Sequence, residues 1–516
     1  MQTWDELLAT AVVGTEQREL QLAARDDDLG QLLAQTNNAD REGSLLTAAA
    51  VLALYRSAGS APPIDTQPAP EACPPDEAQR GSAASAQHLA LMLDGQFREV
   101  LPEWLAAMNK ARRRVPEECL PALLDHGFVE PGLRNMITSV LGRRGEWLAA
   151  QNPDWFYATC RDEREVWETG SREERLLLLE NVRTADPAKA RELVTTTWPQ
   201  ESAKDRIAFL EKFAIGLNAG DEPFLNDALH DRSVEVRRVG RTLLAGLPSS
   251  DFSRRLQELV KPVMSFKRSL IGKARLEVAL PNDDPIAWLK EHNIEVGNPP
   301  QNTTRSFGPK AWYLKEVISL VPVTHWGKLW AKSPLAIIKA ADESEWHESF
   351  ILGFVTAVQR DRDPDWIEAL VAFTASDEKQ TPLLELVRYL PASRLEALSL
   401  RALESQANGL SDGHPAFHLL LAHRSAWSDQ LSRAVVSSLK TRIAKCHDNV
   451  ADWQTKSALK RFARYVSPAL YDELASGWPT DSESWSNWSR NVDAFQSLLA
   501  FRRDMHRAIS EGEERS

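Results

Sequence analysis

The sequence has little that would tie it to a membrane or to an oxidising compartment. Its four cysteines stand at positions 73, 119, 160 and 446 of 516 residues, too far apart for a paired metal or redox motif. No segment approaches the roughly 20 consecutive apolar residues that cross a bilayer. The first residues, Met1 to Glu6, lack the basic and apolar regions of a signal peptide. We therefore expect a cytoplasmic protein without a structural disulfide or a membrane partner.

The motifs of common catalytic chemistries are also missing. The chain contains no G-x-x-x-x-G-K-[ST], no H-E-x-x-H and no G-x-S-x-G, and no G-x-G-x-x-G follows a strand pattern. These absences remove the usual grounds for predicting a nucleotide-binding enzyme, a dinucleotide-binding enzyme, a zinc protease or a hydrolase. We predict no catalytic residue and no cofactor, and a protein that is not an enzyme.

Net charge and chain length further limit the possible partners and domain arrangements. The chain carries 61 Lys and Arg against 73 Asp and Glu, a formal net charge of −12, and 43% of its residues are apolar. An acidic balance argues against general nucleic-acid binding, which depends on cations that displace counterions from phosphates. A chain of this length forms several domains or one elongated array of repeats.

Composition divides the chain into five parts. Residues 57–87 are rich in proline, alanine and serine with few large apolar residues, which is typical of an exposed linker. An N-terminal helical segment, 1–56, precedes this linker. Helical repeats are predicted over 88–262, an irregular connector over 263–310, and a second helical repeat region over 311–516.

The middle of the chain carries the clearest pattern. Helical periodicity predicts six short helices with links of a few residues, and short links favour antiparallel neighbours, hence three stacked hairpins. The helical patterns cover 176–182, 190–197, 207–217, 224–229, 236–247 and 256–260. Asp231 and Arg237 resemble the acidic and basic positions of a HEAT repeat, although Gly240 stands where alanine is usual. We predict an all-α fold, an α-solenoid of HEAT-like hairpins, with a minor β element near 263–296 where Leu276, Val278 and Leu280 alternate.

Positive charge gathers in one segment of this acidic chain. Residues 232–275 hold eleven Lys or Arg against three acidic residues, a local net charge of +8. A basic face of this kind suits an acidic partner or a phosphate backbone, unless its arginines pair within the stack of helices. The predicted interaction face is Arg237, Arg238, Arg241, Arg254, Arg255 and Lys261.

Three histidines form the only candidate metal site in the sequence. His414, His418 and His423 could place two imidazoles on one face of a helix, and a metal-dependent enzyme is one hypothesis that follows. The alternative is that they are exposed or capping histidines, because Pro415 is typical of a helix start.

Several blocks of the first 260 residues resemble a known family. Trp4-Asp5-Glu6-Leu7-Leu8 and the blocks 145–155, 174–187 and 221–248 are similar to an uncharacterised bacterial α-helical family. Genes of that family commonly neighbour those of a SWIM zinc-finger protein, a MoxR-type AAA ATPase and a von Willebrand A domain protein. The resemblance implies a non-enzymatic helical component that works beside the ATPase or the von Willebrand A protein.

Two functions of different classes are compatible with these patterns. The first is a helical-repeat scaffold or adaptor, whose extended surface binds a protein partner. The alternative is a HEAT-like DNA-binding or base-excision protein that uses the basic 232–275 face on phosphates, although the net negative charge makes nucleic acid the less favoured partner.

Overall fold

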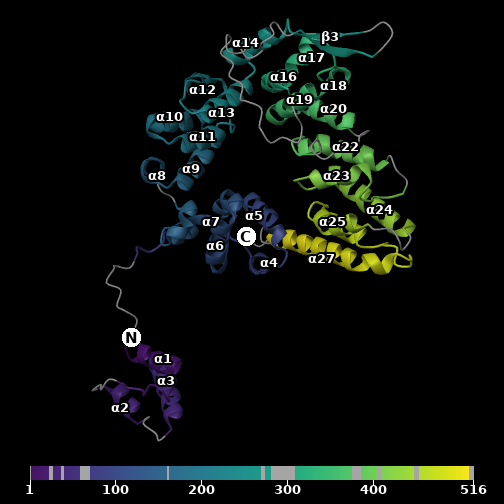
Figure 1. Ribbon diagram of the computed structural model, residues 1–516. Coiled ribbons are helices and arrows are strands. Elements are labelled where there is room, and N and C mark those ends of the chain that lie inside the picture. The colour runs from purple at the N-terminus through teal and green to yellow at the C-terminus, as the bar shows by residue number, and fades with distance from the viewer. Residues whose placement is uncertain are drawn as a thin grey trace. The chain divides into compact units, whose positions relative to one another are not determined.

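The chain is mainly helical in its described parts and divides into two compact units, Met1–Ala72 and Cys73–Ser516 (Figure 1). The computed structural model describes residues 2–22, 27–35, 40–57, 70–159, 162–268, 273–279, 308–374, 385–404, 408–446 and 452–510. The prediction of an all-α fold is confirmed. Within these residues, no helix combines the length and the apolar character needed to cross a membrane.

Unit 1 consists of three helices, α1 (Gln2–Val13), α2 (Asp28–Ala34) and α3 (Arg41–Ser57). Asp27 caps α2, because its side chain accepts a hydrogen bond from the Gly30 amide at 2.9 Å. Helices α1 and α2 both pack against α3. The core between them is small, and its buried side chains are Leu7, Leu29, Leu33, Ala48 and Leu52.

The predicted linker, 57–87, is too long at its C-terminal end. Strand β1 (Gln79–Arg80) pairs in parallel with β2 (Arg113–Arg114), and helix α4 begins at Ala83. The Ser82 hydroxyl accepts a hydrogen bond from the Ser85 amide at 3.0 Å, so a residue typical of linkers acts as a helix cap. Residues 58–69 lie outside the described part of the chain.

The first helices of unit 2 belong to one core that also includes the end of the chain. The α7 helix is kinked at Gly142, whose φ of 67° favours glycine. These elements are α4 (Ala83–Leu93), η1 (Arg98–Val100), α5 (Leu101–Lys110), η2 (Glu117–Cys119), α6 (Leu120–Val129), η3 (Pro131–Leu133), α7 (Arg134–Ala149) and η4 (Pro153–Ala158).

All six helices predicted for the middle of the chain are present, as α9 to α14. Helices α10 and α11 pack against α9, and α13 packs against α11, α12 and α14. The elements are α8 (Glu163–Thr169), α9 (Arg172–Ala185), α10 (Pro187–Thr197), η5 (Trp198–Gln200), α11 (Ala203–Lys212), η6 (Ala219–Asp221), α12 (Glu222–Ala228), α13 (Val234–Ala245) and α14 (Asp251–Val260).

Helices α9, α11 and α13 share positions that recur every 31 residues. Each follows directly after a serine, and each carries an arginine four residues beyond that serine; the residues are Ser171, Ser202, Ser233, Arg175, Arg206 and Arg237. Arg175 forms an ion pair with Glu201, and Arg206 forms one with Asp231, at 2.9 Å. Each of these pairs links one helix to the residues that precede the next helix of the series.

The predicted β element is present as a short hairpin. Strand β3 (Met264–Lys267) pairs antiparallel with β4 (Arg275–Val278), and Met264 lies opposite Val278. Leu276 is buried, as its place in the alternating pattern predicts, whereas Leu280 and the rest of 280–307 lie outside the described residues.

The second half of unit 2 continues with helices and short turns. Helix α16 packs against α13 and α19, and β4 packs against α18. The elements are α16 (Pro309–Leu320), α17 (Val323–Trp330), α18 (Pro334–Asp342), α19 (His347–Asp361), α20 (Pro364–Thr374), α22 (Ala392–Glu404), α23 (Pro415–Ala422), α24 (Asp429–Lys445), α25 (Trp453–Ala463), η7 (Pro468–Leu470), α26 (Tyr471–Leu474) and α27 (Trp485–Ser510).

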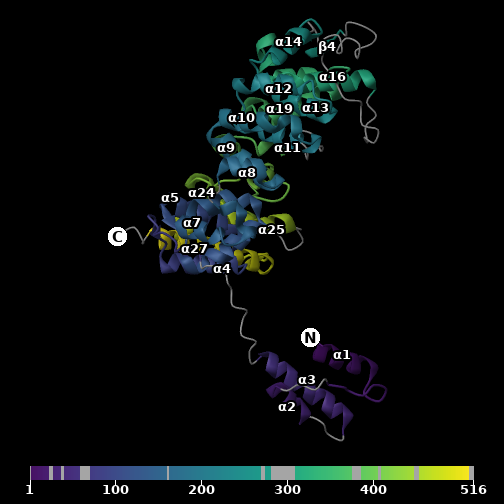
Figure 2. The same cartoon turned by 90° about the vertical axis from the view of Figure 1, so that its left-hand side faces the viewer.

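The last helix of unit 2 packs against its first helices. Helix α27 contacts α4 and α5, and Figure 2, like Figure 1, places it beside α4. The Ser82 hydroxyl donates a hydrogen bond to the Ala508 carbonyl at 2.8 Å. The Phe97 and Phe501 rings stack, with centroids 4.3 Å apart. The two ends of unit 2 are therefore joined by direct contacts.

Candidate partner-binding face

Two of the six predicted face residues do not lie on an exposed face. The side chain of Arg237 is half-buried and donates a hydrogen bond to the Asp231 carbonyl at 2.7 Å. Arg241 is only 7% exposed. The two residues are four apart and share one side of α13, and that side is turned into the structure. The local charge count did not reveal this, because it carries no information about the direction of a side chain.

The other four predicted residues are exposed. Arg238 pairs with Glu235 at 2.7 Å, Lys261 pairs with Glu258 at 3.4 Å, and Arg254 pairs with Asp251. In each pair the acidic residue stands three positions earlier, and both side chains are more than half exposed. Exposed pairs of this kind contribute at most about 1 kcal/mol, so a partner can compete for these cations. Arg255 is exposed and forms no ion pair among the described residues.

Cations from a distant part of the chain adjoin this surface. The pKa of His325 lies below its usual value because the ring is buried; the charges of Lys261 and Lys328 also lower it, while Glu258 opposes them. The charge of Lys261, which follows α14, thus acts on His325 of α17. Lys332 lies over the Phe266 ring of β3, with its Nζ 5.8 Å from the ring centroid.

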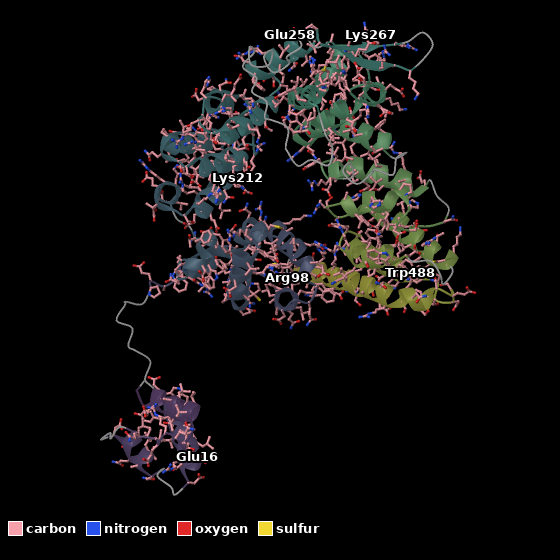
Figure 3. All side chains as sticks on the ribbon, viewed as in Figure 1. Glu16, Arg98, Lys212, Glu258, Lys267 and Trp488 are labelled. Atoms are coloured by element: carbon pink, nitrogen blue, oxygen red, sulfur yellow. The ribbon has the colours of Figure 1, made fainter. Side chains whose placement is uncertain are left out.

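We call this surface the basic face. It comprises six exposed cations from α14, β3, α17 and the residues that follow α14 and α17: Arg254, Arg255, Lys261, Lys267, Lys328 and Lys332. The half-buried rings of Phe266 and Trp330 lie between these elements, with centroids 6.2 Å apart. Figure 3 labels Glu258 and Lys267 along the same edge of unit 2. Sequence reasoning missed Lys328 and Lys332 because they stand more than 50 positions after the basic segment.

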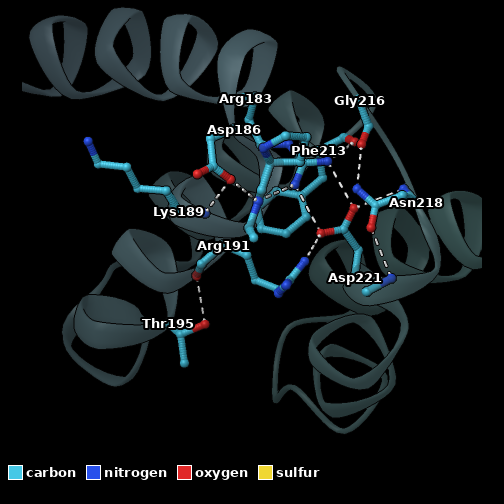
Figure 4. A network of polar contacts seen from close by, with 12 residues as sticks. Arg183, Asp186, Lys189, Arg191, Thr195, Phe213, Gly216, Asn218 and Asp221 are labelled. Carbon is cyan, nitrogen blue, oxygen red and sulfur yellow. Dashed lines mark hydrogen bonds and ion pairs between the residues drawn. The ribbon is translucent and has the colours of Figure 1, made fainter.

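The most deeply buried ion pair has a structural role and leaves no donor for a ligand (Figure 4). Arg183 and Asp221 are both fully buried and form two hydrogen bonds of 2.9 Å. The remaining guanidinium donors reach the carbonyls of Ile215, Pro187 and Phe213. The five N–H groups of Arg183 are thereby all used, and the network joins the end of α9 to the first residue of α10 and to the segment between α11 and α12.

Asp221 is held as a carboxylate in this network. Burial raises the pKa of Asp221, but hydrogen bonds from Arg183, from the Asn218 amide and from Arg191 outweigh that effect, so its pKa lies below the usual value. Arg191 donates to the same carboxylate at 2.9 Å. A fully bonded, buried carboxylate is typical of a structural group rather than of a catalytic base.

The structure does not bring the three candidate metal-ligating histidines together. His414 caps α23, because its Nδ1 accepts a hydrogen bond from the Ala416 amide at 3.0 Å. His423 is buried and lies 3.2 Å from the Ser399 hydroxyl, and burial lowers the pKa of His423 to about 4. His418 is exposed. Over the described ranges, no cluster of three or more His, Cys, Asp or Glu side chains is arranged to hold a metal ion.

Comparison with known proteins places the chain in one family. Neither the curated proteins nor the solved structures contain a match. The model of a family of unknown function, DUF5691, matches residues 6–509. This match includes both units and extends over the second half of the chain. The chain therefore belongs to the DUF5691 family of unknown function.

Proposed function

We propose that this protein is a non-enzymatic helical-repeat scaffold or adaptor that binds an acidic segment of a protein partner through the basic face. The observations that support the proposal are the six exposed cations of α14, β3, α17 and the residues that follow α14 and α17, and the contact between Phe266 and Trp330, in a chain whose net charge is −12. Complementary charge speeds association with an acidic partner and excludes basic ones. Half-buried aromatic rings add contact area of the kind that interfaces use.

The recurrence in α9, α11 and α13 supports the repeat architecture of the proposal. Trp167 and Trp198 are also 31 residues apart, and each lies under the arginine eight residues later, Arg175 at 4.5 Å and Arg206 at 5.7 Å from the ring centroid. Equivalent residues thus make equivalent contacts at an interval of 31 residues, as expected of a HEAT-like α-solenoid. Such arrays present long surfaces that suit the binding of another protein.

The arrangement of charge favours a protein partner over nucleic acid. Arg254 and Lys261 each have an acidic residue three positions earlier, so positive and negative side chains alternate along α14. A phosphate backbone would meet repulsion at Asp251 and Glu258, whereas a protein partner can present basic side chains opposite these two residues, beside the acidic segment that faces the cations. The resemblance described above supplies two candidate partners, a MoxR-type AAA ATPase and a von Willebrand A domain protein.

The test is affinity capture of the full chain from its own cells at low salt, followed by mass spectrometry. We compare the wild-type chain with the face variant, Arg255→Glu with Lys267→Glu. The matched control is Arg424→Glu with Arg490→Glu, because these two exposed arginines form no ion pair among the described residues and the change in net charge is the same. The proposal expects one of the two candidate partners with the wild type and the control, and its loss from the face variant.

The DNA-binding alternative gives a different result in the same set of variants. If the basic face binds phosphates, the wild-type chain binds duplex DNA at low salt. The logarithm of the binding constant then falls with the logarithm of the salt concentration, with a slope of about 0.9 for each phosphate contacted. Duplex binding that the face variant loses, together with capture of neither candidate partner, would replace the adaptor proposal.

A further inference from the structure

The segment just before β1 is held in place without a contribution to either core of unit 2. Residues 73–78, which we call the strap, place no side chain in a hydrophobic core. Four of the six residues are exposed, and the other two are Cys73 and Asp76. Fixing the backbone of a segment costs conformational entropy, and the strap has no apolar burial to offset that cost. We therefore expect the strap to open more readily than the helices beside it.

The Asp76 side chain of the strap fills a break in α7. Helix α7 departs from helical geometry at Gly142, with φ 67° and ψ 179°. The amides of Arg143 and Arg144 donate to the Asp76 carboxylate, at 3.3 Å for Arg144, and the Nε of Arg114 lies 3.5 Å from it. A Cβ on residue 142 would lie 2.5 Å from Asp76 Oδ1, so the carboxylate fits here because residue 142 is glycine.

The strap neutralises a group of arginines. Glu77 pairs with Arg143, and these side chains are 82% and 48% exposed, so salt and competing charges can weaken the pair. With the strap closed, four arginines meet four acidic residues: Arg80, Arg114, Arg143 and Arg144 with Asp76, Glu77, Glu117 and Glu118. With the strap open, four arginines face only two acidic residues, a local net charge of 4 − 2 = +2.

We propose that the strap is an autoinhibitory internal ligand, which occupies a surface that binds an acidic segment of a protein partner when the strap opens. The chemistry of the partner follows from the strap, because Asp76 and Glu77 show that this surface accepts neighbouring carboxylates. Glu117 and Glu118 adjoin the surface and would repel a continuous phosphate backbone, whereas a peptide can present a carboxylate or two. None of these residues belongs to the basic face, so the inference does not rest on the proposed function.

The experiment is the binding of a fluorescent hexaglutamate peptide to the full chain at low salt, measured by anisotropy. Every protein in the series carries Arg255→Glu with Lys267→Glu, so that binding at the basic face does not mask the result. Asp76→Ala with Glu77→Ala is expected to raise the affinity at least about tenfold, because the peptide no longer competes with a tethered ligand. Arg143→Glu with Arg144→Glu, added to these changes, should remove the gain.

The matched control is Glu211→Ala with Asp227→Ala. These two exposed acidic residues form no ion pair among the described residues, and their removal changes the net charge by the same amount. The control should leave the affinity for hexaglutamate unchanged. An equal gain in the control would overturn the proposal, and so would the absence of a gain in the Asp76→Ala with Glu77→Ala variant or a gain that survives the two arginine substitutions.

Hydrogen exchange of the wild-type chain tests the opening without any substitution. The Arg143 and Arg144 amides donate to Asp76, so they exchange when the strap opens. Between low salt and about 1 M salt, exchange in the peptide that contains them should rise at least about threefold, because salt screens exposed charges. Exchange in α4, which has an apolar core contact at Leu89, should change little. Salt-independent exchange at Arg143 and Arg144 would overturn the proposal.

Discussion

Arg502 and Glu103 form an ion pair across 399 residues of sequence, with Nε to Oε2 at 2.6 Å and Nη2 to Oε1 at 2.9 Å. The Arg502 side chain is 1% exposed, and its third nitrogen donates to the carbonyls of Ala463 and Val466. His506 lies 2.7 Å from the same carboxylate. One guanidinium therefore connects α27 to α5 and to the end of α25, and closes unit 2 onto its own first helices.

Removal of the Glu103 carboxylate should lower the free energy of unfolding of unit 2. Glu103→Ala leaves Arg502 buried without its partner, and breaking a buried pair in this way costs about 3 kcal/mol or somewhat more. We expect a loss of that size in the free energy of unfolding, measured by urea denaturation. Glu211→Ala, at an exposed glutamate, should change the free energy by less than about 0.5 kcal/mol. Equal effects of the two substitutions would show that the pair does not stabilise unit 2.

The Arg183 and Asp221 network gives a second stability prediction. Asp221→Asn keeps the shape of the side chain but removes the charge that balances the fully buried Arg183. We expect a loss of about 3 to 5 kcal/mol in the free energy of unfolding. The control is Asp227→Asn, which changes an exposed aspartate of the same segment. A loss under about 1 kcal/mol for Asp221→Asn would contradict the structural role assigned to the network.

His423 should make the fold sensitive to mild acid. Burial lowers the pKa of His423 to about 4 in the folded chain, while an unfolded chain has a histidine pKa near 6.5. The unfolded state therefore binds the proton first, and stability is lost as the pH falls from about 6.5 toward 4. The loss from this group approaches about 3 kcal/mol at the lower end. His423→Gln should flatten the dependence of the free energy of unfolding on pH in this window. An unchanged slope would show that His423 is not buried in its neutral form.

Much of the local structure could be predicted from the sequence. Apolar periodicity located the six helices of the middle segment, because each buries one side against its neighbours. The start of α10 has a local cause as well, because the carboxylate of Asp186 accepts hydrogen bonds from the Ala188 and Lys189 amides. Alternation around Leu276 predicted a minor β element, which is present as the β3 and β4 hairpin. These signals are local, so they could be interpreted without a three-dimensional structure.

The features that sequence reasoning missed depend on contacts between residues that lie far apart in the sequence. No local pattern connects Glu103 to Arg502, and no charge count shows that Arg241 is turned inward. The 31-residue recurrence of Ser171, Ser202 and Ser233 is visible in the sequence, but the intervening helices differ enough in length and composition to hide it. A comparison of the chain with itself at fixed offsets would have found this period.

The central claim, that the basic face binds a protein partner, is tested most directly on purified proteins. The measurement is the dissociation constant of the wild-type chain for whichever candidate is captured, the MoxR-type ATPase or the von Willebrand A protein, at low salt and at physiological salt. We predict that Arg255→Glu with Lys267→Glu weakens binding at least about tenfold at low salt, with a smaller difference at high salt, because salt screens exposed charges. Arg424→Glu with Arg490→Glu should leave the constant unchanged. Equal dissociation constants for the face variant and the wild-type chain would contradict the account.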